Sequence, residues 1–160
     1  MSSHNTEPQP EESKSENPNI TLVNITTLDR EKGFIVLGGH PCKIKGIHKI
    51  RSGFKSTKTI VVGSSIFTGK EHSQNFLSYA MVEVPIIKRI EYSLIGIEDN
   101  FASLMDKEGN LREDLKLPSS KEKGDLTEKI INAFEANQTV IVTVLEALEQ
   151  EMIVDLKEDY

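Results

Sequence analysis

The segment at residues 41–63, PCKIKGIHKIRSGFKSTKTIVVG, decides the fold of the first half of the chain. Its first positions alternate between apolar and basic side chains, which places Cys42 and Ile44 on one face of a strand and two lysines on the other. The β-branched run TIVVG at 59–63 predicts the returning strand. Residues 48–58 are therefore predicted to be the loop of a β-hairpin, where side chains are free of packing contacts.

Short strands are also predicted on both sides of this hairpin. Structure should begin near Ile20, where β-branched residues become frequent, and FIVL at 34–37 leads into a Gly38-Gly39 turn. YAMVEVP at 79–85 alternates between small or polar and apolar side chains and ends in proline. We therefore expect the first domain to cover residues 20–84.

The second half of the chain, residues 85–160, predicts several strands and one helix inserted late. Strand-like segments lie at residues 92–97, 101–105, 111–117, 139–145 and 152–156. Leu126, Ile130 and Phe134 form an apolar stripe at helical spacing, and Asp125 precedes the stripe as an N-cap or first-turn acid. About five strands with a single late helix are compatible with an OB-type barrel.

Composition restricts the class of protein. Residues 1–19 are rich in proline and glutamate and have no large apolar side chain after Met1, so we expect a disordered acidic tail. No stretch reaches the ~20 apolar residues of a membrane span, and no signal peptide is recognisable. The single cysteine excludes an internal disulfide and agrees with a reducing compartment. We expect a cytoplasmic protein with no membrane partner.

The charge of the chain is unevenly distributed. Its net charge is −6, yet the segment 32–70 contains eight Lys or Arg residues and no Asp or Glu. The other residues carry eleven Lys or Arg against twenty-five Asp or Glu. A local positive field of this kind attracts polyanions. The alternative is a solvated strand face whose lysines only prevent edge-to-edge aggregation.

No catalytic or metal-binding motif is recognisable. The chain lacks GxSxG, HExxH and CxxC, and its four histidines have no ligand-like spacing. The segment GSSIFTGK at 63–70 departs from a phosphate-binding loop, because five residues separate its glycines and Glu71 follows the lysine. A nucleophilic Cys42 with His40 as its base is weighed against a buried cysteine, and the buried cysteine is favoured. We expect no enzyme activity, no metal and no cofactor.

Five segments in succession resemble one family, the hypusine-containing eukaryotic translation initiation factor 5A. They are GFIVLGGHPCKI (33–44), IFTGKE (66–71), VEVPIIKR (82–89), LIGIEDNFASLMDKEGNLREDLKLP (94–118) and IVTVLEAL (141–148). They occur in the family's order and cover the chain from about residue 28 to 150. The resemblance implies a mainly β protein in which an N-terminal SH3-like β barrel precedes a C-terminal OB-fold with one helix. It also implies a ribosome-bound factor that contacts peptidyl-tRNA and rRNA and promotes peptide bond formation at stalled ribosomes, in elongation and termination.

The hairpin at 48–58 departs from the family's pattern. In the family the lysine after the first glycine becomes hypusine, whereas here Phe54 follows Gly53 and the nearest lysine, Lys55, is displaced by one residue. Glycines on either side of the modified lysine permit backbone angles that Phe54 and Ser56 resist. We therefore expect a translation factor without standard hypusine. Modification of Lys55 by a deoxyhypusine-forming enzyme is the alternative.

An unmodified hairpin predicts a direct RNA contact. The expected RNA-binding residues are Lys49, Arg51, Gly53, Phe54, Lys55 and Lys58. The cations would hold phosphates, and Phe54 would either stack on an exposed base or pack locally on the barrel. Two other functions stay open, an RNA or protein adaptor that has left the ribosome, and a self-assembling structural protein like the fungal Woronin body proteins that resemble this family.

Overall fold

The computed structural model divides the chain into two compact units, one ending at Ile86 and one beginning at Ile87. It describes residues 12–14, 17–52, 56–119 and 123–159. Each unit has a separate cluster of buried apolar side chains.

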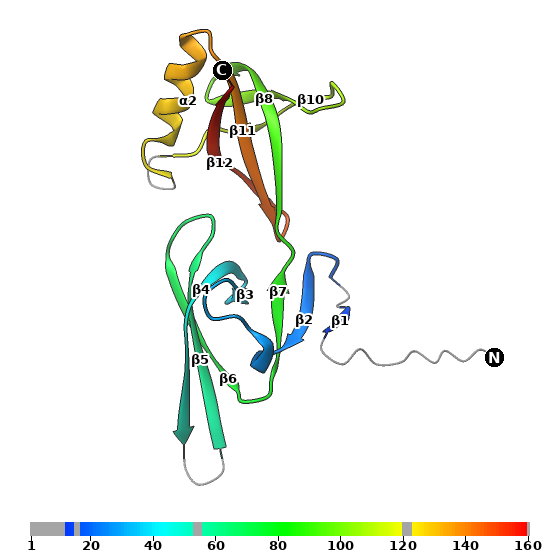
Figure 1. The fold of residues 1–160 in the computed structure, drawn as a ribbon, viewed down its shortest axis with the longest axis vertical. Coiled ribbons are helices and arrows are strands. Elements are labelled where there is room, and N and C mark those ends of the chain that lie inside the picture. Colours follow the sequence, from blue (N-terminus) through cyan, green and yellow to red (C-terminus); the bar gives the residue numbers. More distant parts are fainter. Residues whose placement is uncertain (1–11, 15–16, 53–55, 120–122, 160) are drawn as a thin grey trace, which may run out of the picture. The chain divides into compact units, whose positions relative to one another are not determined.

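Two antiparallel sheets form the first unit (Figure 1). Its elements are β1 (Glu12–Lys14), β2 (Ile20–Asn24), the 3-10 helix η1 (Ile25–Thr27), β3 (Phe34–Leu37), β4 (His40–Ser52), β5 (Ser56–Ser65), β6 (Glu71–Leu77) and β7 (Met81–Pro85). The strand order is β1-β2-β7 in one sheet and β3-β4-β5-β6 in the other. β3 packs beside β7 and joins the two sheets into the predicted SH3-like barrel.

The alternation in the opening segment sets the core of this barrel. Cys42 and Ile44 point inward and are 0% and 3% exposed, as the pattern predicts. They pack with Ile35, Leu37 and Val61, which come from β3 and β5. The turn between β3 and β4 is the predicted glycine pair, and both glycines have a positive φ that other residues rarely adopt.

Four strands, β4, β5, β6 and β1, differ from the prediction. β4 continues to Ser52 and β5 begins at Ser56, so residues 48–52 and 56–58 lie in paired strands where the sequence predicts a loop. The strands stay paired there because the ladder is formed by backbone hydrogen bonds, which do not depend on the identity of the side chains.

The strand β6 was not predicted, since EHSQNFL has little apolar content, and its side chains are exposed or half-buried. β1 pairs with β2 inside the segment predicted as a tail, and supplies backbone partners to that strand.

The second unit is the predicted OB-fold, in which a five-stranded sheet is accompanied by the helix α2 (Figure 1). Its elements are β8 (Lys88–Glu98), β9 (Phe101–Met105), β10 (Leu111–Lys116), α2 (Leu126–Glu135), β11 (Thr139–Ala147) and β12 (Gln150–Asp159). The strand order is β10-β9-β8-β11-β12, with every neighbouring pair antiparallel. Leu104, Val142, Val144 and Ile153 are fully buried between the strands.

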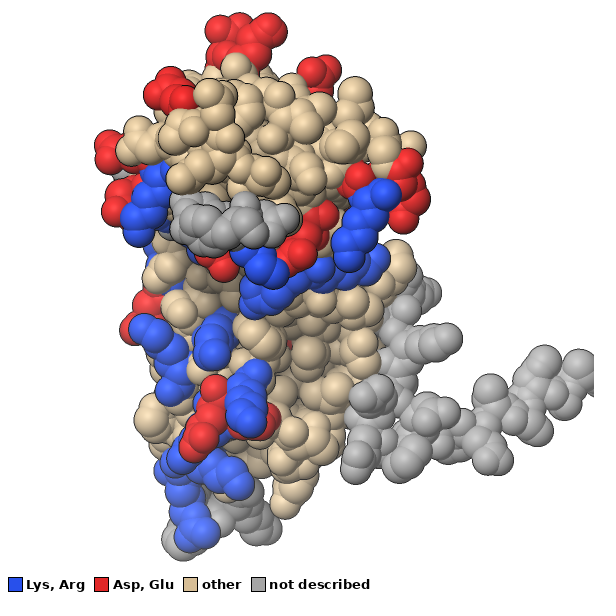
Figure 2. Space-filling model, turned by 45° about the horizontal axis from the view of Figure 1, so that its top comes forward, with Lys and Arg blue, Asp and Glu red and all other residues tan. Residues whose placement is uncertain are grey.

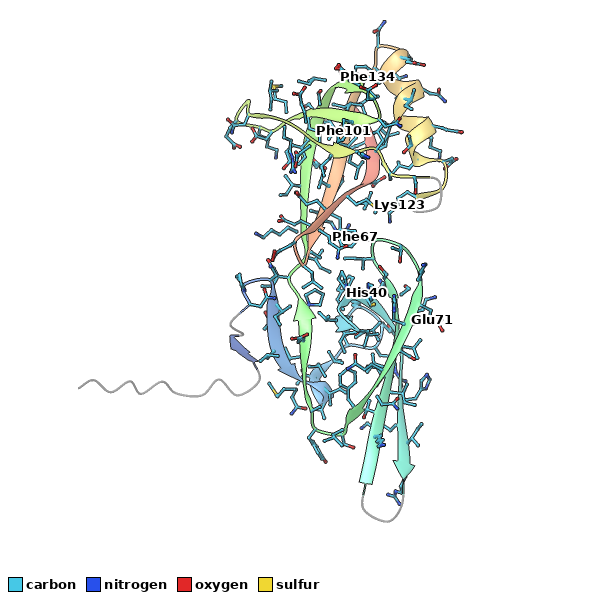
Figure 3. The ribbon with its side chains drawn as sticks, turned by 180° about the vertical axis from the view of Figure 1, so that it is seen from behind. His40, Phe67, Glu71, Phe101, Lys123 and Phe134 are labelled. Carbon is cyan, nitrogen blue, oxygen red and sulfur yellow. The ribbon has the colours of Figure 1, made fainter. Side chains whose placement is uncertain are left out.

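The helix α2 covers this core with the predicted apolar stripe. Ile130 is fully buried, and Leu126 and Phe134 pack against the same cluster. Phe134 points from α2 toward the strands (Figure 3). Asp125 occupies the N-cap position but makes no capping hydrogen bond, and its carboxylate instead lies 3.7 Å from the Lys129 ammonium.

Arg112 links the two ends of the five-stranded sheet. Its guanidinium donates two hydrogen bonds of 2.8 and 2.9 Å to the carboxylate of Glu151, which joins β10 to β12. It also donates to both carboxylate oxygens of Asp114 and to the hydroxyl of Tyr92. The hydrogen bonds from Arg112 lower the pKa of Asp114 below its ordinary value. This half-buried bidentate pair therefore holds the barrel closed.

Candidate nucleic-acid interface

A β-bulge in β4 decides which face of the hairpin each cation occupies. The register shifts between Ile44 and Gly46, where one extra residue enters β4. Side chains alternate with period two, so the extra residue changes which positions point inward. Cys42 and Ile44 point inward before the bulge, and Ile47 packs on the core after it.

Lys49 and Arg51 share the inner face with Ile47. Lys49 is paired with Thr59, whose side chain is buried, and Arg51 is paired with Thr57. Because residues directly opposite in a ladder lie on the same face, these two cations continue the line of the barrel core. Both side chains are nevertheless exposed. The hairpin thus carries inward-facing charges where it extends past the apolar core.

Lys58 lies on the opposite face. It is paired with Ile50 on β4 and with Leu77 on β6, and all three side chains are exposed. Lys43, which precedes the bulge and alternates with the buried Cys42, is exposed with its ammonium 5.9 Å from the Phe34 ring centroid. The predicted RNA-binding cations therefore do not gather on one face of the hairpin. They are distributed over both.

These cations have no ion-pair partner in the part of the chain that the structure describes. The salt bridges found there, Arg112–Asp114, Arg112–Glu151, Lys129–Asp125 and Lys157–Glu91, all belong to the second unit. Lys and Arg side chains are frequent over the β4–β5 hairpin in the lower part of the space-filling view (Figure 2). We use the name basic ribbon for Lys43, Lys45, Lys49, Arg51 and Lys58 on β4 and β5. It carries uncompensated positive charge on both faces.

Three of the predicted site residues, Gly53, Phe54 and Lys55, lie outside the described residues. The stacking role of Phe54 and the modification of Lys55 stay predictions. The two strands on either side of them are paired up to Ser52 and Ser56.

A small cavity at the base of the basic ribbon was not predicted. It has a volume of about 200 Å³ and is lined by Arg30, Lys49, the hydroxyl residues Thr26, Thr59 and Ser78, and three aliphatic side chains. Arg30 is held there by a hydrogen bond from its Nη2 to the carbonyl oxygen of Ile47. No local sequence signal marks this site, because its walls come from segments as far apart as Ile25 and Ser78.

Thr59, one of the residues that line this cavity, has an unpaired hydroxyl. The side chain is 2% exposed, and within the described part of the chain Oγ1 has no hydrogen-bond partner. An unsatisfied buried hydroxyl costs about 1–3 kcal/mol.

We expect Thr59→Val to raise the free energy of unfolding by about 1 kcal/mol, because valine keeps the shape and removes the unsatisfied hydroxyl. Chemical denaturation in a phosphate-free buffer measures this difference. The matched control is Thr26→Val in the same cavity, which deletes a 2.8 Å hydrogen bond between the Thr26 hydroxyl and Asn24 Oδ1 and should destabilise. A destabilised Thr59→Val variant would contradict the interpretation.

Cys42 is a structural residue. It is fully buried, burial raises the pKa of its thiol, and its Sγ donates to the carbonyl oxygen of His40 at 3.4 Å. The imidazole of His40 instead stacks on His72, with ring centroids 4.3 Å apart. Figure 3 shows His40 at the start of β4. The preference for a buried cysteine over a Cys-His pair is confirmed.

The described residues contain no cluster of three or more His, Cys, Asp or Glu side chains arranged to hold a metal ion. None of their helices has the length and apolar character required to cross a membrane.

The family model described as "Eukaryotic elongation factor 5A hypusine, DNA-binding OB fold" matches residues 86–157. The chain is 35% identical over 130 residues to eukaryotic translation initiation factor 5A-1 of Saccharomyces cerevisiae, covering 81% of this chain and 80% of the relative. It is also 35% identical over 130 residues to eukaryotic translation initiation factor 5A of Drosophila melanogaster, covering 80% and 79%.

Solved structures agree with these sequence comparisons. A translation initiation factor eif-5a family protein from Naegleria fowleri superposes with a TM-score of 0.79 at 32% identity, covering 87% of this chain and 99% of that one. Eukaryotic translation initiation factor 5A from Methanococcus jannaschii has a TM-score of 0.64 at 23% identity, covering 88% and 96%, and supports the fold alone. Since the sequence relatives match over about four fifths of both chains, the protein belongs to the eukaryotic translation initiation factor 5A family, a family of translation factors.

Proposed function

We propose that this protein binds the ribosome and tRNA in the cytoplasm and promotes peptide bond formation at stalled ribosomes, in elongation and termination. The observation that carries the proposal is the basic ribbon, whose cations have no carboxylate partner among the described residues. Unpaired Lys and Arg side chains on a projecting hairpin are suited to neutralise phosphates of peptidyl-tRNA and rRNA.

The distribution of charge over two faces favours a partner that surrounds the hairpin. Lys49 and Arg51 face one way, and Lys58 faces the other. A flat polyanionic surface would engage only one of these faces. An RNA cleft would engage both, which is the environment that ribosomal RNA and a bound tRNA can supply. Association should weaken steeply with salt, because each neutralised phosphate releases counterions.

In this proposal the hairpin works without standard hypusine. Phe54 stands at the sequence position where the family carries the modified lysine, so an aromatic residue replaces a long cation there. An aromatic ring can stack on an unpaired base with little sequence preference. Lys55 then serves as an additional phosphate contact and needs no aminobutyl group.

We expect Lys55→Arg to retain ribosome binding within about twofold, since arginine keeps the positive charge while it cannot be converted to hypusine. Co-sedimentation with ribosomes measures this, using protein purified from its own cells. Lys55→Glu is the matched control and should weaken binding. If both variants lost ribosome binding equally, and if Lys55 of the unaltered protein carried a mass increment, the modification would be required.

The activity itself can be tested in a translation extract depleted of its own factor 5A. Added protein should restore peptide bond formation on a message that stalls ribosomes. Failure to restore it, with no binding to ribosomes, would contradict the proposal. Sedimentation of the pure protein as a persistent large assembly would favour the self-assembling alternative.

A further inference from the structure

We propose that the cavity at the base of the basic ribbon is a phosphate-binding site formed by Arg30, Lys49 and Thr59. The ligand is a tetrahedral phosphate group, which can be inorganic phosphate or a backbone phosphate of RNA. The second source rests on the proposed function, whereas the first does not. Three independent features of the cavity support the proposal.

The first feature is the sign of the charge around the cavity. Arg30 and Lys49 line it, and among the described residues no Asp or Glu lines it. The carboxylate of Asp29, the neighbour of Arg30 in the chain, is already hydrogen-bonded to the backbone. Its Oδ1 accepts hydrogen bonds from the backbone N–H groups of Glu31 and Lys32 at 2.9 and 3.1 Å, which lowers the pKa of this carboxyl. The described wall of the cavity therefore has two cations and no carboxylate.

The second feature is the unpaired hydroxyl of Thr59. The side chain of Thr59 is buried, its Oγ1 has no partner among the described residues, and Thr59 lines the same cavity as the two cations. Burial of a polar group without a hydrogen bond is unfavourable and is rare in folded proteins. A phosphate oxygen would accept the hydrogen bond that this hydroxyl lacks in the free protein.

The third feature is the fixed position of the guanidinium. Arg30 donates from Nη2 to the carbonyl oxygen of Ile47 on β4, which holds the side chain against the strand that also carries Lys49. A guanidinium has five N–H donors in a fixed fork, so one backbone bond leaves others for an anion. A preorganised guanidinium loses less conformational freedom on binding phosphate than a free surface arginine.

Together these groups offer the donors that a phosphate requires. The guanidinium and the ammonium supply charge-assisted hydrogen bonds, and the hydroxyl supplies a neutral one. Thr26 and Ser78 add hydroxyl groups at the wall. Both already donate, to Asn24 Oδ1 and to the carbonyl oxygen of Thr57 respectively, so Thr59 alone supplies an uncommitted hydroxyl proton.

The first experiment titrates inorganic phosphate into the full chain and follows backbone amide signals by NMR at constant ionic strength, with chloride as the reference. We expect saturable shifts at residues 25–30, 47–49 and 59. Thr59→Val should weaken this binding about tenfold while the protein stays folded. Arg30→Gln combined with Lys49→Gln should abolish it. The control Lys43→Gln combined with Lys45→Gln removes two ribbon cations outside the cavity and should leave phosphate affinity unchanged.

The second experiment separates the two sources of phosphate. It compares tRNA affinity of the unaltered chain and of Thr59→Val, a substitution that changes no charge. A backbone phosphate of RNA is identified as the ligand if Thr59→Val binds tRNA more weakly and if inorganic phosphate displaces tRNA from the unaltered chain better than chloride does. Unchanged tRNA affinity together with saturable phosphate binding identifies a free phosphate. Absence of cavity shifts in the phosphate titration, with tRNA affinity also unaffected by Thr59→Val, would overturn the proposal even if the protein binds tRNA normally.

Discussion

Charge reversal of the basic ribbon, by Lys49→Glu, Arg51→Glu and Lys58→Glu together, is expected to lower tRNA affinity by about 100-fold or more at low salt. The three side chains are exposed, and no described carboxylate pairs with them, so their charge is available to phosphates. The slope of log affinity against log salt should also fall by about one for each contact removed. Fluorescence anisotropy over a series of salt concentrations measures both quantities.

The matched control reverses two lysines and one arginine in the second unit, Lys88, Arg89 and Lys107. All three are exposed, so the change in net charge is identical. If both variants lost the same affinity, long-range net charge and not the ribbon would explain the binding.

Leu104→Ala is expected to lower the free energy of unfolding of the OB-fold by about 3 kcal/mol. Leu104 on β9 is fully buried and packs with Leu94, Val142 and Ile153 inside the five-stranded barrel. Truncation removes buried apolar area and leaves a cavity that the β strands cannot fill by local collapse. Because the chain has two units, we expect amide exchange to accelerate in residues 87–159 and to change little in the first unit.

Leu111→Ala is the control for this substitution. Leu111 is on the neighbouring strand β10 but is 62% exposed, so its truncation should cost well under about 1 kcal/mol. A similar loss for both leucines would show that the barrel interior is not where the structure places it.

The sequence predicts well the elements that bury one face, because their apolar residues recur with the period of a strand or a helix. Cys42 and Ile44 are inward as their alternation indicates, and Ile130 on α2 is buried as its helical spacing indicates. β6 escaped prediction because its residues are mostly polar and its stability comes from the ladder with β5. The contact between Arg112 and Glu151 also escaped, because the two residues are 39 positions apart.

The sequence predicts which residues form the candidate site, but not the faces of the hairpin on which they lie. Lys49, Arg51 and Lys58 are exposed on the hairpin, yet they occupy two faces because of a bulge beside Gly46. An isolated glycine within a strand can mark a bulge, but the prediction did not use this signal. The cavity beside Lys49 could not be predicted at all. Its other walls come from η1, from the loop that follows η1 and from the turn before β7, and only the folded barrel brings them to Thr59.

The most direct test of the account maps the RNA contact on the protein. Amide signals of the isotopically labelled full chain are followed by NMR while tRNA is added at low salt. We predict that the largest perturbations fall on residues 47–52 and 56–59, with small effects on residues 87–159. Perturbations confined to the OB-fold, or none anywhere on the chain, would contradict the claim that the basic ribbon holds RNA.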